Sequence, residues 1–129
     1  MNYPEPYGLE CGDGWKDIIH RTHDKLKYID PEYKISQIKE KFGGLRYYYN
    51  MSFDSYDDVR RQIMDDIVAA AELESFRTCE LCGVSGLSKE VETRNLNRWY
   101  YTYCKECSDK KIAYRNESLS SAENRETTL

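Results

Sequence analysis

The sequence predicts an α+β fold, in which a small antiparallel sheet with flanking helices is followed by a treble-clef-like zinc-binding half. Two stretches have the apolar spacing of helices, two alternating stretches meet at a glycine pair, and two Cys-x-x-Cys pairs lie in the second half of the chain. At 129 residues the chain is long enough for one compact domain. We expect an α+β portion over residues 1–76, a zinc-binding portion over 77–116 packed as part of the same domain, and a disordered tail over 117–129.

The composition predicts a soluble cytoplasmic protein. Charged residues make up 33% of the chain, the net charge is −4, and no apolar run approaches the roughly 20 residues that cross a membrane. The mild acidity argues against nonspecific binding to nucleic acid, which depends on neutralised phosphates, although it permits a local basic face. The chain has 12 tyrosines and 3 phenylalanines, and tyrosine suits both the rim of a small core and a surface that binds a ligand.

The N-terminal part predicts an extended arm and then a helix. The arm covers residues 1–9 and contains two prolines. The glycines around Asp13 predict a turn, and Asp13 is the expected N-cap of a helix over about residues 13–29. Pro31 ends this helix, because the residue before a proline is pushed out of the helical region. The apolar residues expected on its core side are Trp15, Ile18, Ile19, Leu26 and Ile29.

Two strands are expected over residues 34–42 and 45–53, with Gly43-Gly44 as a two-residue type I′ turn. This turn would place Phe42 opposite Leu45. The face expected to enter the core carries Ile38, Phe42, Leu45, Tyr47, Tyr49, Met51 and Phe53. The opposite face is expected to carry Gln37, Lys39, Lys41, Arg46, Tyr48 and Asn50.

A second helix is expected over about residues 56–76, capped by Asp54 or Ser55. Its first turn contains acids, which the positive end of the helix dipole favours. The apolar stripe predicted to face the core is Val59, Ile63, Ile67, Ala70 and Ala71.

The two Cys-x-x-Cys pairs have the spacing by which four thiolates close a tetrahedral zinc site. Gly83 follows the first pair and is free to adopt a positive φ in a zinc knuckle. Short strands over 87–92 and 98–103, with a turn at 95–97, would lead to a helix over 108–115 whose first turn carries the last ligands, which is the order of a treble clef. The predicted zinc ligands are Cys79, Cys82, Cys104 and Cys107.

Two disulfides or four reduced core cysteines are the alternatives to zinc. No stretch resembling a signal peptide precedes the domain, so a reducing compartment is expected, and this disfavours disulfides. Four protein thiolates leave no open position for water or substrate, so the zinc is expected to be structural. The fifth cysteine, Cys11, could belong to a second metal site with His20 and His23, but a free thiol and two surface histidines are the favoured interpretation.

No catalytic constellation emerges, since the chain has no HExxH, GxSxG or P-loop sequence, and a non-enzymatic protein is expected. The candidate residues for binding a ligand or partner lie on the outer face and turn of the first hairpin. Cations beside one aromatic plane suit a phosphate-bearing ligand with a base to stack, or an acidic protein surface. A solvated strand face that lysines protect from aggregation is the alternative. The candidates are Lys39, Lys41, Gly43, Gly44, Arg46 and Tyr48.

The sequence GDGW at residues 12–15, the segment IKEKFGGLRYY at 38–48 and the two cysteine pairs together resemble a family of small phage and prophage proteins. The resemblance covers residues 11–107 and implies a phage origin, a zinc-ribbon-like half and action in the host cell cytoplasm. The family brings no activity that transfers to these residues. As a class, such proteins act on host machinery, so we expect a protein that blocks or sequesters a component of host defence, either a host protein or a nucleotide signal. The alternative is a zinc-containing regulator that binds nucleic acid or the transcription apparatus.

Overall fold

The computed structural model describes residues 9–53, 57–86 and 90–112, and its fold is α+β, as predicted. The arm before residue 9 and the predicted tail lie outside the described residues. A helical segment over 105–112 follows the last strand. The elements before it are β1 (Leu9–Glu10), the 3₁₀ helix η1 (Asp13–Trp15), α1 (Lys16–Ile29), β2 (Lys34–Lys41), β3 (Gly44–Asn50), α2 (Asp58–Ser75), β4 (Val91–Leu96) and β5 (Trp99–Cys104).

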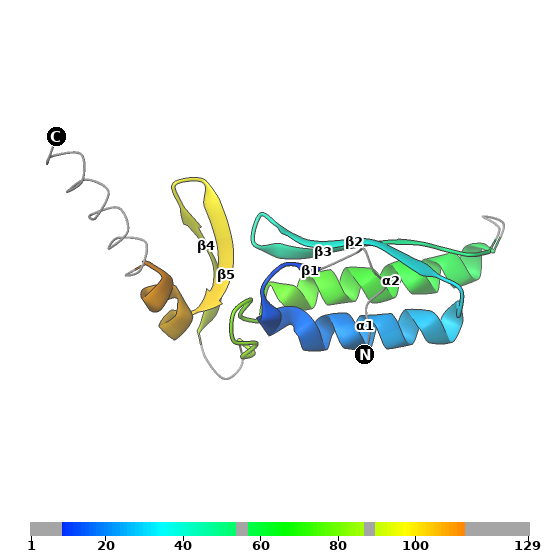
Figure 1. Ribbon diagram of the computed structural model, residues 1–129, viewed down its shortest axis with the longest axis horizontal. Coiled ribbons are helices and arrows are strands. Elements are labelled where there is room, and N and C mark those ends of the chain that lie inside the picture. Colours follow the sequence, from blue (N-terminus) through cyan, green and yellow to red (C-terminus); the bar gives the residue numbers. More distant parts are fainter. Residues whose placement is uncertain (1–8, 54–56, 87–89, 113–129) are drawn as a thin grey trace, which may run out of the picture.

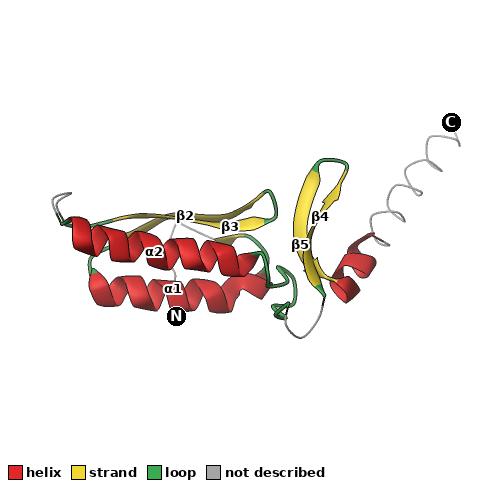
Figure 2. Ribbon diagram, turned by 180° about the vertical axis from the view of Figure 1, so that it is seen from behind, coloured by secondary structure: helices red, strands yellow, loops and turns green. Residues whose placement is uncertain are grey.

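The α+β portion has two layers. Helices α1 and α2 lie side by side on one face of the sheet β1-β2-β3, and the hairpin β4–β5 stands beyond the β2–β3 turn (Figure 1 and, from behind, Figure 2). Strand β1 pairs with β2 in parallel, an addition that the sequence did not predict. Fully buried side chains of both layers form the main core, among them Trp15, Ile19, Leu26, Ile38, Leu45 and Met64.

The β2–β3 turn differs from the predicted one. Phe42 and Gly43, with φ of 55° and 85°, form the two-residue turn, so Lys41 pairs with Gly44 and Lys39 pairs with Arg46. The predicted partners are therefore wrong throughout the hairpin. Moving the turn by one residue shifts the register by two, and because side chains alternate with period two, the residues keep their predicted faces.

Phe42 is the exception, and its assignment to the core is wrong. As a turn residue it belongs to neither face, and its side chain is 62% exposed. The core face of the hairpin instead includes Ile35, Ile38, Leu45 and Tyr47, all buried.

Alanine substitutions at Leu45 and Phe42 are expected to have unequal effects. Leu45 is 1% exposed, so Leu45→Ala should lower the free energy of unfolding by about 2–5 kcal/mol through lost burial and a cavity. Phe42→Ala should change it by about 0.5 kcal/mol or less, because the ring is mostly in solvent. Urea unfolding of both variants beside the parent measures the difference. Equal losses would show that Phe42 belongs to the core after all.

Helix α2 turns a different side to the core from the one predicted. Val59 and Ile63, the first two positions of the predicted stripe, are 73% and 45% exposed. Ile67 packs only partly against the core, and Ala70 is exposed. The predicted stripe is thus wrong in phase except at Ala71, which is buried as predicted. The buried residues of α2 are Met64, Val68, Ala71 and Ser75.

The phase of α2 follows from its contacts with the edge of β3. Ser75 is fully buried, and its hydroxyl accepts a hydrogen bond of 2.9 Å from the backbone N–H of Leu45. A carboxylate oxygen of Glu72 accepts another, of 3.0 Å, from the N–H of Tyr47. These polar side chains satisfy N–H groups on the edge strand β3 that would otherwise be unpaired. The side of α2 that carries them therefore faces the sheet, in place of its most apolar side.

The helix caps also differ from those predicted. Asp13 lies inside η1 rather than capping it, and Gly12 occupies the N-cap position without a side-chain bond. Asp57 caps α2 by accepting a 3.1 Å hydrogen bond from the N–H of Arg60. The predicted caps Asp54 and Ser55 lie outside the described residues.

The second hairpin is displaced along the chain relative to its prediction. β4 and β5 begin and end later than expected and are joined by Asn97 and Arg98, with φ of 52° and 69°. The side chain of Asn95 accepts a 3.0 Å hydrogen bond from the N–H of Arg98, which holds this tight turn. Part of the predicted first strand, residues 87–89, lies outside the described residues.

Within the described ranges, no helix combines the length and apolar character needed to cross a membrane.

Candidate metal centre

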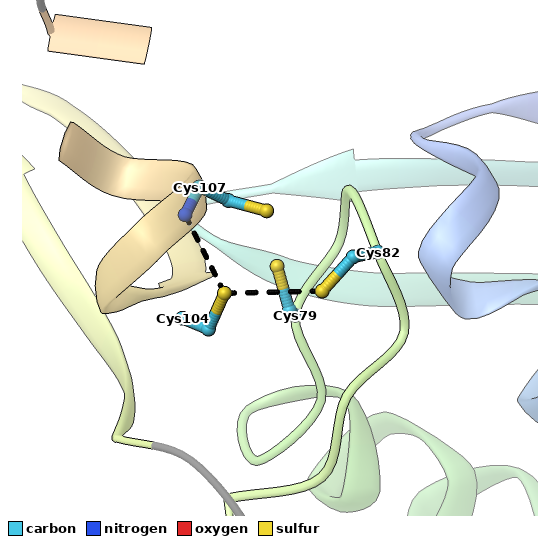
Figure 3. Close-up of side chains that lie close together, drawn as sticks. All are labelled: Cys79, Cys82, Cys104 and Cys107. Carbon is cyan, nitrogen blue, oxygen red and sulfur yellow. Dashed lines mark hydrogen bonds between the residues drawn. The ribbon is translucent and has the colours of Figure 1, made fainter. Parts of the chain in front are cut away.

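Four cysteine side chains converge between the knuckle and the end of β5 (Figure 3). The sulfur atoms of Cys79, Cys82, Cys104 and Cys107 all lie within 4.8 Å of one another. A tetrahedral site with metal–sulfur bonds of about 2.3 Å separates its sulfurs by about 3.8 Å. The Cys82 and Cys104 sulfurs are 3.8 Å apart, and all four thiols are free of disulfides. The spacing therefore fits a shared metal ion and not a pair of disulfides.

The backbone around the first pair forms the predicted knuckle. Gly83 has a φ of 81°, as predicted, and its N–H donates to the carbonyl of Cys79 at 2.9 Å. The N–H of Cys79 in turn donates to the carbonyl of Val84 at 3.0 Å. A side chain at position 83 would be strained by this φ, which explains the glycine.

The second pair comes from a strand end and a helix start. Cys104 is the last residue of β5, and Cys107 lies in the first turn of the helical segment 105–112, which begins earlier than predicted. The N–H of Cys107 donates to the sulfur of Cys104 at 3.5 Å. The order of knuckle, hairpin and helix is that predicted for a treble-clef-like half.

The thiols have unequal pKa values. Burial tends to raise the pKa of Cys79, but backbone N–H groups of Cys82, Cys104 and Leu81 donate to its sulfur and lower the pKa to about 7. Burial raises the pKa of Cys107, and the neighbouring thiol groups raise it further. A bound divalent cation would remove this mutual penalty, because it attracts each thiolate.

The GDGW segment, residues 12–15, docks directly on the knuckle. The N–H of Gly14 donates to the carbonyl of Glu80 at 2.7 Å, and the N–H of Gly12 donates to the Glu80 carboxylate at 2.8 Å. The indole N–H of Trp15 donates to the carbonyl of Thr78 at 2.9 Å. A Cβ on Gly14 would lie 2.1 Å from the carbonyl oxygen of Cys79, so only glycine permits this approach. The sequence predicted a turn here but gave no sign of its docking partner.

The β2–β3 turn also contacts the zinc-binding half. The hydroxyl of Thr102 donates to the carbonyl of Gly43 at 2.6 Å, and a Cβ on Gly43 would lie 2.9 Å from the Thr93 methyl group. A Cβ on Gly44 would lie 2.3 Å from the ring of Phe76. Both glycines of the predicted ligand site are therefore buried in contacts within the chain.

The four predicted site side chains lie on the sheet face opposite α1 and α2. Lys39 and Arg46 are direct cross-strand partners, and the Lys39 ammonium lies 5.9 Å from the centre of the Tyr48 ring. Tyr48 is 42% exposed. Among the described residues, no carboxylate forms an ion pair with Lys39, Lys41 or Arg46.

Sequence reasoning missed three residues beside this face. Lys34 pairs with Asn50 on the outer side, because a register shift at Ser36 reverses the alternation before it. Phe42 contacts Tyr100 of β5 edge to face, with ring centres 5.9 Å apart. The irregularity of β2 brings Lys34 to this face, and the approach of β5 brings Tyr100 beside Phe42, so the sequence carried no signal for any of the three.

Cys11, His20 and His23 do not form a metal cluster within the described residues. Burial raises the pKa of Cys11 to about 12, and nearby carboxylates, Glu80 first, raise it too. His23 is hydrogen-bonded through Nδ1 to the hydroxyl of Tyr33. Burial and the charge of Lys27 lower the His23 pKa.

Comparisons of the chain with protein-family models, curated proteins and solved structures find no match, so the residues themselves carry the functional argument.

Proposed function

We propose that this chain is a non-enzymatic zinc-containing binding protein, encoded by a phage, that sequesters a nucleotide signal of host defence. The observation that carries the proposal is the outer face of the first hairpin, where Lys39 and Arg46 lie next to the exposed Tyr48 and Lys41 follows further along β2. Cations bind phosphates and the tyrosine plane stacks a base, so one small surface holds both parts of a nucleotide.

Zinc is the metal that suits the cysteine cluster best. Thiolates are soft ligands, and a tetrahedral set of four is typical of structural zinc. All four positions are filled by protein sulfur, which leaves none for water or substrate. This favours a metal that stabilises the fold, and it is the reason for proposing binding without catalysis.

The role in host defence rests on the resemblance to phage proteins, and the outer face favours a nucleotide signal over a host protein. An acidic protein surface would satisfy the cations but would leave the aromatic plane unused. A regulator that binds nucleic acid is the second candidate, because basic and aromatic strand faces also bind single strands.

Charge reversal on the outer face tests the proposal. The parent protein should bind a nucleotide from host extract and release it on heating. Arg46→Glu and Lys41→Glu should each abolish this binding, because each places a carboxylate where a phosphate binds. The proteins should stay folded and keep their zinc, since surface substitutions change stability by about 0.5 kcal/mol or less. The measurement is mass analysis of small molecules and proteins retained by each variant, beside circular dichroism melts.

Lys25→Glu is the matched control, because Lys25 is an exposed cation on α1, under the opposite face of the sheet. It makes the same change in charge and should retain the nucleotide. Folded Arg46→Glu and Lys41→Glu proteins with full retention and full effect on phage growth would contradict the proposal. Retention of a host protein without any nucleotide would contradict it as well.

A further inference from the structure

The turn requires a positive φ at position 42, but neither the turn nor the core explains why the residue there is phenylalanine. Its φ of 55° lies in the left-handed region, which is unfavourable for a bulky residue, although Gly43 and Gly44 follow immediately. The ring is 62% exposed and makes an edge contact with Tyr100, itself 39% exposed. A strained backbone that presents an apolar ring to solvent is a feature found at functional sites.

The ring of Phe42 repeats the arrangement seen at Tyr48. The Lys39 ammonium lies 5.9 Å from the Tyr48 ring centre, and the Lys41 ammonium lies 5.7 Å from the Phe42 ring centre. Both distances are close to the limit of about 6 Å for a cation over an aromatic ring, so the lysines are held loosely there. The outer face and the adjoining turn thus carry two pairs of one aromatic ring and one cation.

The two rings stand at opposite ends of the cationic strip. Tyr48 is level with Gln37, whereas Phe42 follows Lys41, the last residue of β2. At about 3.3 Å per residue, the levels of Gln37 and Lys41 are roughly 13 Å apart. Lys39, Arg46 and Lys41 lie between them. A ligand that used both rings would need a base at each end and phosphate in the middle.

We propose that the outer face binds a short oligonucleotide, linear or cyclic, whose two bases stack on Tyr48 and on Phe42 beside Tyr100. This inference rests on the proposed function and specifies its ligand. The linking phosphates contact Lys39, Lys41 and Arg46, and each base displaces a loosely held lysine from its ring toward the phosphates. A mononucleotide occupies only one of the two rings.

The charge of the face favours a short ligand over a long nucleic acid. Glu10 lies beside Lys39 in the register of β1 and accepts a 3.2 Å hydrogen bond from the side chain of Gln37. This carboxylate offsets one cation, and the chain as a whole has a net charge of −4. Because a diadenylate has two phosphates, the logarithm of its binding constant should fall with the logarithm of salt concentration with a slope no steeper than about −1.4.

The probes are adenosine 5′-monophosphate, a 5′-phosphorylated linear diadenylate, cyclic diadenylate and a long oligoadenylate. At least one diadenylate should bind about 5- to 150-fold more tightly than the monophosphate, because a second base stacks. Comparison of the linear and cyclic forms identifies the geometry of the ligand. Isothermal titration calorimetry at two salt concentrations gives the affinities and the slope.

Phe42→Asn is the decisive variant. Asn-Gly is the preferred sequence for a type I′ turn, so this protein should fold and melt at least as well as the parent. It should lose the advantage of the diadenylate while its affinity for the monophosphate stays the same. Phe42→Tyr keeps an aromatic plane and should retain the advantage. Tyr48→Ala should weaken the binding of both ligands.

Each outcome separates this inference from the proposed function. Equal binding of monophosphate and both diadenylates, abolished by Arg46→Glu, would overturn the two-base ligand and leave nucleotide binding intact. Unchanged diadenylate affinity in folded Phe42→Asn would do the same. Much tighter binding of the long oligoadenylate, with a steeper salt slope, would overturn the short ligand in favour of a nucleic acid. No binding of any probe to the parent protein would overturn both proposals for this face.

Discussion

Cys104→Ser is expected to abolish zinc binding and to unfold the zinc-binding half. A structural zinc ion contributes roughly 10–16 kcal/mol of apparent binding free energy. The whole stability of a small domain is about 5–15 kcal/mol. Cys104 is 1% exposed, and its sulfur also accepts the N–H of Cys107, so serine at this position loses both the metal and a local contact. Elemental analysis and circular dichroism melts measure the effect.

The loss should extend to the N-terminal portion through the GDGW segment. The amide of Gly14 is bonded to the carbonyl of Glu80, which lies in the knuckle between Cys79 and Cys82. Hydrogen exchange at Gly14 should therefore accelerate when zinc is removed by a chelator, whereas the centre of α1 should respond less. Exchange that accelerates only after residue 78 would show that the two portions are uncoupled.

Cys11→Ala is the matched control for Cys104→Ser. Cys11 is half-buried at the edge of the main core and lies outside the metal cluster. This variant should keep one zinc ion per chain and a nearly unchanged melt. Zinc retained by Cys104→Ser, or lost from Cys11→Ala, would contradict the ligand assignment.

Trp15→Ala is expected to lower the free energy of unfolding by about 3–5 kcal/mol. Trp15 is 0% exposed, so its removal leaves a large cavity in the main core. The substitution also leaves the carbonyl of Thr78 without its indole donor, next to Cys79 of the cysteine cluster. Urea unfolding gives the magnitude, and chelator titration should show that zinc leaves this variant more readily.

Trp15→Phe separates the two contributions, because it keeps much of the ring volume but removes the N–H. Its zinc should also be more labile, although its stability loss should be smaller. Asp13→Ala is the control within the same segment, since the Asp13 side chain is 82% exposed and pairs only with Lys16 among the described residues. A Trp15→Ala protein as stable as Asp13→Ala would contradict the docking role of the GDGW segment.

The metal centre and the candidate ligand face are joined by short contacts. The N–H of Glu80 donates to the carbonyl of Thr102 at 2.9 Å, and the hydroxyl of Thr102 holds the carbonyl of Gly43. Gly43 is the turn partner of Phe42. The half that contains the cysteine cluster therefore positions the hairpin tip, so a metal bound there would help to shape the proposed binding surface.

Local patterns were enough to identify the four cysteines that converge and the faces of the hairpin residues. The Cys-x-x-Cys spacing identifies each pair of candidate ligands, and the knuckle and the β4–β5 hairpin bring the two pairs together. The outer positions of Lys39, Lys41, Arg46 and Tyr48 were also correct despite the wrong turn, because an even shift of register preserves the faces of a strand. Their role as a ligand site stays a prediction.

The phase of α2 and the docking of the glycines required the tertiary structure. Apolar spacing favoured Val59 and Ile63 as core residues, but the edge of β3 needs hydrogen-bond acceptors, and Ser75 and Glu72 provide them. The apolar spacing of α2 cannot predict these hydrogen bonds, because the N–H groups that need acceptors lie on a strand distant in sequence.

The sequence by itself determined the α+β class, the four cysteines that converge and the alternation of the hairpin, since each follows from a local spacing pattern in the chain. Only the tertiary structure decided that Gly14 fits against the knuckle, that Gly43 contacts β5 and that Phe42 is left at an exposed turn. These three features depend on contacts with backbone segments that are distant in sequence. The approach of the knuckle and of β5 excludes side chains at Gly14 and Gly43, and it places the ring of Phe42 beside Tyr100.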